Sequence, residues 1–218
     1  MRHLILPALL GLLGLSLSSQ QALAQQTEIP DYDNARRLFW GELYDAGGET
    51  LYCGVEFGSS RQRGLNVEHV FPMSWVTKEL NCGTRRECRR NSKRFNHIEA
   101  DLHNLFPART DINDDRGSFS FGMVKGEARK YGSCDFEVDF KRRQVEPRPA
   151  ARGDIARAMF YMADTYGFTI FRRQGKLLAR WHREDPPSAL ERRRNDHIEQ
   201  LQGTRNPFID NPERALPF

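Results

Sequence analysis

The densest group of side chains capable of catalysis lies between residues 66 and 116. It comprises Glu68-His69, the basic residues Arg85, Arg86, Arg89 and Arg90, the run Asp101-Leu102-His103-Asn104, and the run Ile112-Asn113-Asp114-Asp115-Arg116. Such a set combines a proton acceptor, oxygen ligands for a hard cation, and fixed positive charges. Hydrolysis of a phosphodiester needs all three together, because a water must lose a proton while the phosphate and the leaving oxygen gain negative charge.

Three residues are candidates for the base and the metal ligands. The neutral ring of His69 can accept a proton near neutral pH, because an unperturbed histidine titrates at about 6.5. Glu68 and Asn113 offer the oxygen ligands that Mg²⁺ prefers, and the same donors suit Mn²⁺ or Ca²⁺. Neighbouring side chains of a regular strand point to opposite faces, so we expect the strand to bend or end where Glu68 meets His69.

The same residues resemble those of a known family, the bacterial endonuclease I group of ββα-metal (His-Me finger) nucleases. The closest segments are, in order, Asn66–Pro72, Arg85–Cys88, Glu99–Leu105 and Asn113–Arg116. Looser similarity extends through Tyr131–Cys134, Arg152–Arg157, Trp181 and Arg205–Phe208. Several matches in one order arise by chance far less often than one short motif.

The resemblance implies a role for each matching residue. His69 resembles the family's general base, Glu68 and Asn113 its metal ligands, and Arg85 the arginine that binds the scissile phosphate. Asn104, nine positions before Asn113, resembles a residue that supports this site. The implied activity is metal-dependent, sequence-nonspecific endonucleolytic cleavage of DNA and also RNA, which leaves 5′-phosphate and 3′-hydroxyl ends.

Other charged residues of this region leave alternatives open. Arg85 is assigned by its distance from Cys88, and Arg86 could take its place. Asp114 stands where the family has glycine, and it could bind the metal through water or face solvent. Arg86, Arg89 and Arg116 are expected to contact the nucleic-acid backbone, which would give salt-sensitive affinity without base recognition. Three further basic runs cannot be placed on one face from the sequence: 141–143, 172–173 and 192–194.

The beginning of the chain and the cysteines indicate export. Residues 1–24 read as a signal peptide, with Arg2, an apolar stretch over 4–17 that is too short for a membrane anchor, and a small-residue cleavage pattern at 22–24. We expect a periplasmic or secreted monomer of residues 25–218. Four cysteines in an oxidising compartment predict two disulfides. Cys82 with Cys88 and Cys53 with Cys134 is the favoured pairing of three possible ones.

Hydrophobic periodicity predicts one α+β domain. Helices are expected over 31–46, 153–166, 176–184 and 188–202, strands over 51–57, 65–70 and 100–107, and a polar loop over 78–93. A further helix should begin near Ile112, capped by Thr110 or Asp111. We therefore expect a ββα-metal element over about 65–121, packed among helices from both ends of the chain.

Two alternatives from other functional classes remain. Cys82, Cys88, His97 and His103 could form the Cys₂His₂ site of a zinc-stabilised binding module, although five residues separate the cysteines where two to four are usual. An exported protein that binds nucleic acid without cutting it would share the basic residues but show no turnover. The net charge of +4 does not separate these classes.

Overall fold

A computed structural model describes residues 24–59, 63–126, 130–214, 216 and 218. The predicted signal peptide therefore lies outside the described residues, except for Ala24. Within the described part of the chain, no helix is both long enough and apolar enough to cross a membrane.

The predicted ββα element is present. Strand β3 (Leu65–His69) pairs antiparallel with β4 (Leu105–Arg109), so that His69 lies opposite Leu105, and α5 (Thr110–Arg116) follows directly. The second strand begins later than predicted, because residues 102–104 form the 3₁₀ turn η2 (Leu102–Asn104). The predicted cap of α5 is wrong, since Thr110 already belongs to the helix and Arg109 precedes it without a side-chain cap.

Three short helices connect the two strands: α2 (Met73–Glu79), α3 (Arg85–Asn91) and α4 (Lys93–Glu99). The predicted loop over 78–93 is therefore wrong. Helix α3 begins with a capping box in which Thr84 and Glu87 exchange hydrogen bonds, and Ser92 caps α4 by accepting from the Phe95 amide. Cys88 and Phe95 turn inward and are fully buried, which attaches these polar helices to the core.

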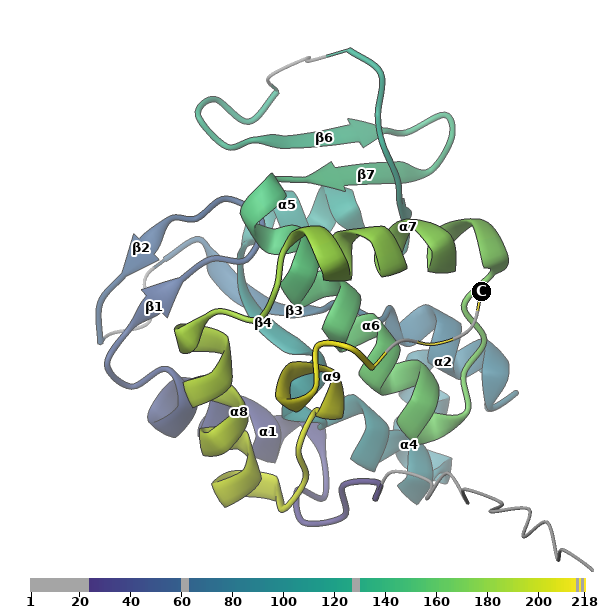
Figure 1. The fold of residues 1–218 in the computed structure, drawn as a ribbon. Helices are drawn as coiled ribbons and strands as arrows, with labels where there is room; N and C mark the ends of the chain where they lie inside the picture. The colour runs from purple at the N-terminus through teal and green to yellow at the C-terminus, as the bar shows by residue number, and fades with distance from the viewer. Residues whose placement is uncertain (1–23, 60–62, 127–129, 215, 217) are drawn as a thin grey trace, which may run out of the picture.

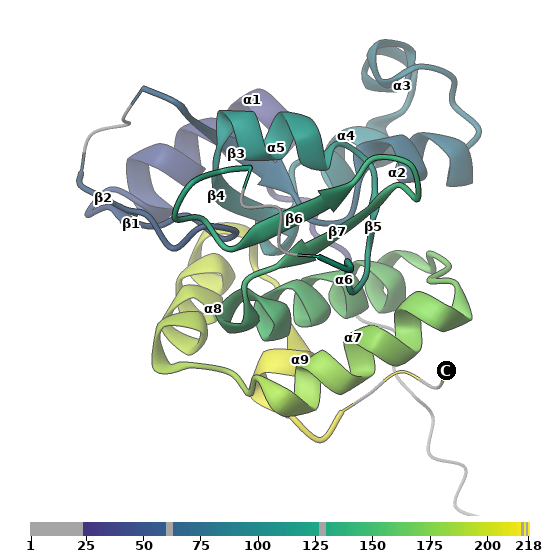
Figure 2. The same cartoon turned by 90° about the horizontal axis from the view of Figure 1, so that it is seen from above.

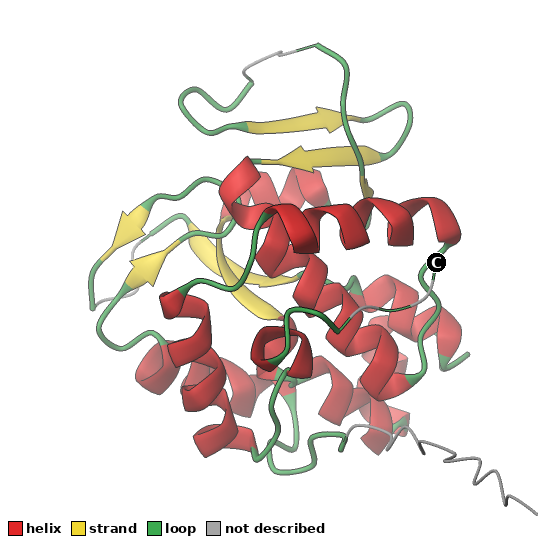
Figure 3. Cartoon of the chain, viewed as in Figure 1, coloured by secondary structure: helices red, strands yellow, loops and turns green. Residues whose placement is uncertain are grey.

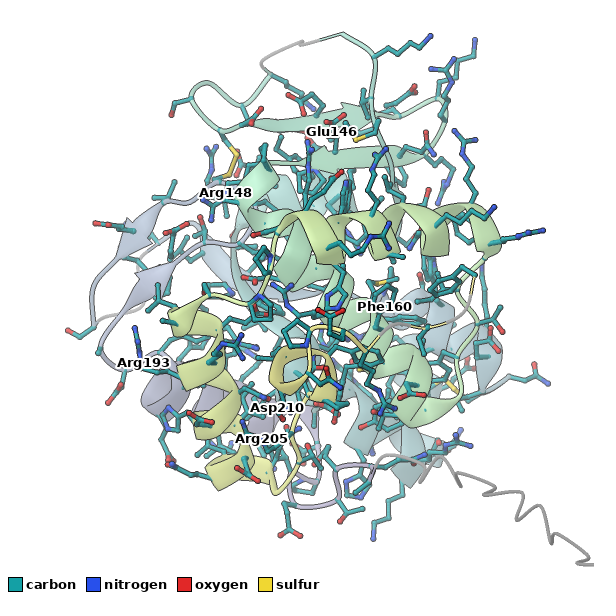
Figure 4. All side chains as sticks on the ribbon, viewed as in Figure 1. Glu146, Arg148, Phe160, Arg193, Arg205 and Asp210 are labelled. Carbon is teal, nitrogen blue, oxygen red and sulfur yellow. A yellow bond between two sulfur atoms is a disulfide. The ribbon has the colours of Figure 1, made fainter. Side chains whose placement is uncertain are left out.

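A layer of helices covers the other side of the element. Helix α6 (Arg152–Tyr166) follows the short turn η3 (Pro149–Ala151), is buried along most of its length, and packs against α7 (Arg172–Glu184) (Figure 2). Helix α8 (Ala189–Gln202) agrees with the helix predicted over 188–202; Ser188 caps its start and the left-handed Gly203 follows its end. An ion pair of 2.6 Å between Arg205 and Asp210 joins the segment after α8 to α9 (Pro207–Asp210) (Figure 4). The N-terminal helix α1 (Tyr32–Leu38) continues into the π-helical turn η1 (Phe39–Leu43).

The described strands form three small sheets (Figure 3). Besides β3 and β4, there is a pair of β1 (Gly48–Glu49) and β2 (Glu56–Phe57), so the predicted strand over 51–57 is mostly a turn. A third sheet, not predicted, has the order β5-β7-β6 and comprises β5 (Ser120–Phe121), β6 (Phe136–Asp139) and β7 (Gln144–Pro147). The α+β single-domain architecture is confirmed.

A buried polar network ties the turn before β4 to distant segments. The fully buried Asp101 accepts hydrogen bonds from the hydroxyls of Tyr161 (3.0 Å) and Tyr166 (2.6 Å) and from the Gln202 amide (2.8 Å). The His103 ring bonds the carbonyl of Thr204 at 3.0 Å. The turn that leads into β4 is thus fixed by α6 and by the end of α8.

Both predicted disulfides, Cys53–Cys134 and Cys82–Cys88, are present. No cysteine in the described part of the chain is free, and no cluster of three His, Cys, Asp or Glu residues there could hold a metal. The zinc-module alternative is therefore wrong, because its two cysteines are bonded to each other.

Candidate active site

A cavity of about 430 Å³ lies between β3, α2, α3 and α5. Four of the predicted site residues line it: Glu68, His69, Arg85 and Asn113. The remaining lining residues are Tyr32, Val67, Pro72, Met73, Ser74, Thr77, Gly117 and Ser118. Residues from five separate elements, α1, β3, α2, α3 and α5, therefore meet in one place.

Glu68 and His69 both line the cavity although they are neighbours in β3, and the strand ends directly after them. His69 is the last residue of the strand. Beyond it, the side chain of Asn104 accepts from the Phe71 amide at 2.6 Å and donates to the Phe71 carbonyl at 3.0 Å. Asn104 is fully buried and does not line the cavity, so it holds the chain that leaves the strand. The predicted end of the strand at this point is confirmed.

The His69 ring is held in one orientation. Its Nε2 lies 2.9 Å from the carbonyl oxygen of Glu99, and a carbonyl can only accept, so Nε2 carries the hydrogen. In the neutral ring the proton-free nitrogen is then Nδ1. Burial, aided by the nearby charge of Arg85, lowers the pKa of His69 to about 3. The ring is therefore neutral at physiological pH, with one lone pair available to take a proton.

Glu68 and Asn113 both line the cavity, and each carries oxygen atoms that could bind a metal. The Tyr52 hydroxyl donates to Oε1 of the buried Glu68 at 2.6 Å, and the Arg116 guanidinium lies 3.2 Å from the same oxygen. Burial raises the pKa of Glu68, and the charge of Arg116 opposes that rise. The Asn113 amide nitrogen donates a hydrogen bond to Asn66 at 2.9 Å. The amide oxygen of Asn113 is the atom that could bind a metal. Two oxygen donors in one cavity fit a hard divalent cation.

Two arginines are anchored at the rim by one buried carboxylate. Glu99, whose side chain is 1% exposed, forms ion pairs with Arg85 and, at 2.7 Å, with Arg89. Both guanidiniums lie over the ring of Tyr32, and the His69 ring lies 5.0 Å from the same ring between centroids. Arg85 lines the cavity and Arg86 does not, so position favours Arg85 as the phosphate ligand.

The expectation for Arg116 changes, and the structure favours one of the two alternatives for Asp114. Arg116 was predicted to contact nucleic acid, but its side chain is 1% exposed. It binds the carbonyls of Val70 (2.5 Å) and Gly117 (2.9 Å) as well as Glu68, so that prediction is wrong. Asp114 is exposed and outside the cavity, which corresponds to the alternative in which it faces solvent.

Sequence reasoning missed Tyr32, Tyr52 and Glu99. Glu99 lies in a segment that resembles the family, yet it acts on His69 through a backbone carbonyl, which no side-chain motif reveals. Tyr52 is 16 residues before the glutamate that it contacts, and Tyr32 lies on the N-terminal helix. Nothing in the local sequence around either tyrosine points to this site.

Comparison with known proteins adds an independent finding. The family model described as Endonuclease I matches residues 17–213. The chain belongs to the endonuclease I family. Among its relatives from Aeromonas hydrophila, an extracellular deoxyribonuclease is 42% identical over 72% of this chain and 71% of its own length. A periplasmic deoxyribonuclease from the same organism is 35% identical over 78% and 81%. Endonuclease-1 of Buchnera aphidicola subsp. Acyrthosiphon pisum is 36% identical over 75% and 67%.

Membership of the endonuclease I family makes the chain a nuclease, a hydrolase, and the predicted family and enzyme class are confirmed. The noncatalytic nucleic-acid-binding alternative is not retained. The extracellular and periplasmic relatives confirm that this endonuclease I protein is periplasmic or secreted.

Proposed function

We propose that this endonuclease I protein hydrolyses phosphodiester bonds of DNA, and also of RNA, without sequence preference, leaving 5′-phosphate and 3′-hydroxyl ends. One observation carries the proposal: a single cavity contains the neutral His69 ring, the oxygens of Glu68 and Asn113, and the guanidinium of Arg85. These are a base, two ligands for a cation and a fixed positive charge, the three requirements of the reaction.

Glu68 and Asn113 would hold the divalent cation, and Mg²⁺ is the favoured ion, with Mn²⁺ or Ca²⁺ compatible with the same donors. When bound, such an ion supplies charge neutralisation at the phosphate and at the 3′-oxygen that leaves. Tyr52 and Arg116 keep the Glu68 carboxylate oriented, because both contact its other oxygen.

His69 takes a proton from the attacking water through Nδ1, while the Glu99 carbonyl keeps the ring from rotating. The positive charge of Arg85, with that of Arg89, helps to lower the pKa of His69 in the free protein. A bound phosphate offsets part of the effect of those charges, while the larger effect, burial of the ring, remains.

Arg85 would hold the scissile phosphate, and Arg86 and Arg89, both exposed on α3, would contact phosphates on either side. Contacts to the backbone give affinity that depends on salt and not on sequence. We expect the protein to act as a monomer, since the proposed site is built from one chain.

The first test is cleavage of supercoiled plasmid and of a long RNA by the oxidised, exported protein, with Mg²⁺ or with EDTA. We expect Mg²⁺-dependent nicking that falls by about a hundredfold or more in His69→Ala, the usual contribution of a general base. The matched control His197→Ala removes a histidine outside the cavity and should cut normally. Near-normal cutting by His69→Ala, or equal cutting in EDTA, would refute the proposal.

A further inference from the structure

We propose that the tip of the β6–β7 hairpin and the segment after α5 form a second nucleic-acid contact, which binds an unpaired base of the substrate strand. This inference rests on the proposed function, because the cleavage cavity fixes where the strand runs. The tip surface is defined by Phe119, Lys130, Phe140, Arg142 and Arg143. It would make single strands the better-bound substrate.

The centre of the tip surface is a pair of aromatic rings. Phe140, 51% exposed, begins the turn between β6 and β7, and it meets the partly exposed Phe119 edge-on with 6.0 Å between ring centroids. Singly exposed apolar residues are ordinary, but two adjacent rings within a charged turn form a patch that needs an explanation. The rings offer apolar faces next to water.

Cations flank both rings. The Lys130 ammonium lies 4.7 Å from the Phe140 centroid, and the Arg143 guanidinium lies 4.9 Å from that of Phe119. Lys130 and Arg142 pair with Asp115 and Asp139 while Arg143 is exposed, so three cations of the tip surface against two acids leave an excess of +1, and the neighbouring Lys141 is also exposed. Aromatic rings for stacking, combined with positive charge for the backbone, are the features with which proteins bind single-stranded nucleic acid.

The basic residues 141–143 have a different structural role from the basic residues 192–194. Arg192 and Arg194 donate to backbone carbonyls of Ile209, Leu102 and Leu105, so they serve the fold. Arg143 instead adopts a left-handed backbone, φ 54°, where glycine or asparagine is usual, and its carbonyl accepts from the Ser120 amide at 3.1 Å. The tip is thereby fixed to the segment that leaves α5.

Along the chain, the tip surface begins directly after residues that line the cleavage cavity. Gly117 and Ser118 line that cavity, and Phe119 is the next residue. From Asn113 to Gly117 the chain rises about 1.5 Å per residue, and each of the two further steps adds at most about 3.8 Å. The Cα atom of Phe119 therefore lies within about 14 Å of that of Asn113. A stacked strand advances about 3.4 Å per nucleotide, so this separation corresponds to about four nucleotides between Asn113 and the Phe119 backbone. Figure 1 shows the hairpin as an outer layer above α5 and α7.

The occupant is an unpaired base and not a duplex, because paired bases present their edges in the grooves and keep their faces stacked. Binding is measured in EDTA by fluorescence anisotropy, with a fluorescein-labelled oligothymidylate and with a duplex of equal length. We expect Phe140→Ala to weaken single-strand binding by about fivefold or more, and to leave duplex binding unchanged. Phe140→Trp should restore the single-strand affinity. The control Phe171→Ala removes a ring of similar exposure, 47%, outside the tip surface and should change neither affinity.

The outcomes separate this inference from the proposed function. If the wild type cuts nucleic acid and Phe140→Ala still binds the single strand normally, the tip assignment is overturned and the function stands. If Phe140→Ala loses single-strand affinity but the wild type never cuts, the function fails and the second contact stands. An equal loss for single strand and duplex would overturn the assignment of base stacking.

Discussion

Replacing Arg116 with methionine removes one partner of a buried ion pair and tests whether that pair supports the site. The Arg116 and Glu68 side chains are 1% and 4% exposed, and their charges lie 3.2 Å apart. Loss of one partner leaves an uncompensated buried carboxylate, so we expect the free energy of unfolding to fall by about 3–5 kcal/mol. At about 2–4 °C per kcal/mol for a chain of this size, the melting temperature should fall by about 6–20 °C.

The pH dependence of the variant has a definite sign. Burial already raises the pKa of Glu68 above its ordinary value of 4.5, and Arg116 is the main influence against that rise. Without Arg116 the pKa rises further, so the folded protein holds a proton that the unfolded chain releases. The deficit should therefore be smallest at acidic pH and grow as the pH rises from 4.5 through the raised pKa.

Urea denaturation at several pH values measures the effect, and Glu68→Gln completes a double-mutant cycle. The double variant should recover part of the loss, because it buries no unpaired charge. Arg180→Gln is the matched control, since the exposed Arg180–Glu184 pair at 3.8 Å should contribute less than about 1 kcal/mol. A loss below about 1 kcal/mol in Arg116→Met, or simple additivity with Glu68→Gln, would refute the reasoning.

Two further predictions concern stability. The Cys53–Cys134 disulfide spans 81 positions and the Cys82–Cys88 disulfide 6, so loop entropy predicts losses of about 4–5 and about 2 kcal/mol for the paired alanine variants in urea denaturation. Loss of the Cys82–Cys88 disulfide should lower activity more than loss of Cys53–Cys134, because the shorter bridge holds the helix that carries Arg85. Equal losses of stability and equal losses of activity in the two variants would contradict this assignment. Burial lowers the pKa of His103 to about 4, so the unfolded chain binds the proton first and stability should decline by about 3 kcal/mol as the pH falls from 6.5 to 4. His103→Gln should flatten that slope in urea denaturation, and an unchanged slope would exclude His103 as its source.

Local signals account for the elements that were predicted. Helix α8 runs from Ala189 to Gln202, between a serine that can cap its start and a glycine that can end it, and both residue types are recognisable in the sequence. Helix α3 was not predicted, although Thr84 and Glu87 form a recognisable capping box. Its sequence is rich in arginine, and its single buried residue, Cys88, gives no apolar periodicity. The β6–β7 hairpin gave no turn signal, since Arg143 occupies the left-handed position where glycine or asparagine would mark a turn.

The site was predictable as far as its residues are close in sequence or fall within the resembling segments. The cavity brings Glu68, His69, Arg85 and Asn113 together as expected. The burial of Arg116 could not be predicted, because it depends on how α5 packs against the end of β3. A charged residue in a polar segment is expected to be exposed, and only the structure shows that Arg116 pairs with the buried Glu68.

The network around Asp101 has a consequence for the order in which the protein can be completed. Its hydrogen bond to Gln202 spans 101 positions, and the His103 contact with Thr204 spans the same number. A chain synthesised and exported from its N-terminus presents β3, β4 and α5 long before residues 202–204 follow. Contacts so distant in sequence are slow to form. The turn before β4 can therefore gain these contacts only after residues 202–204 have been synthesised, and until then the nuclease centre is unfinished.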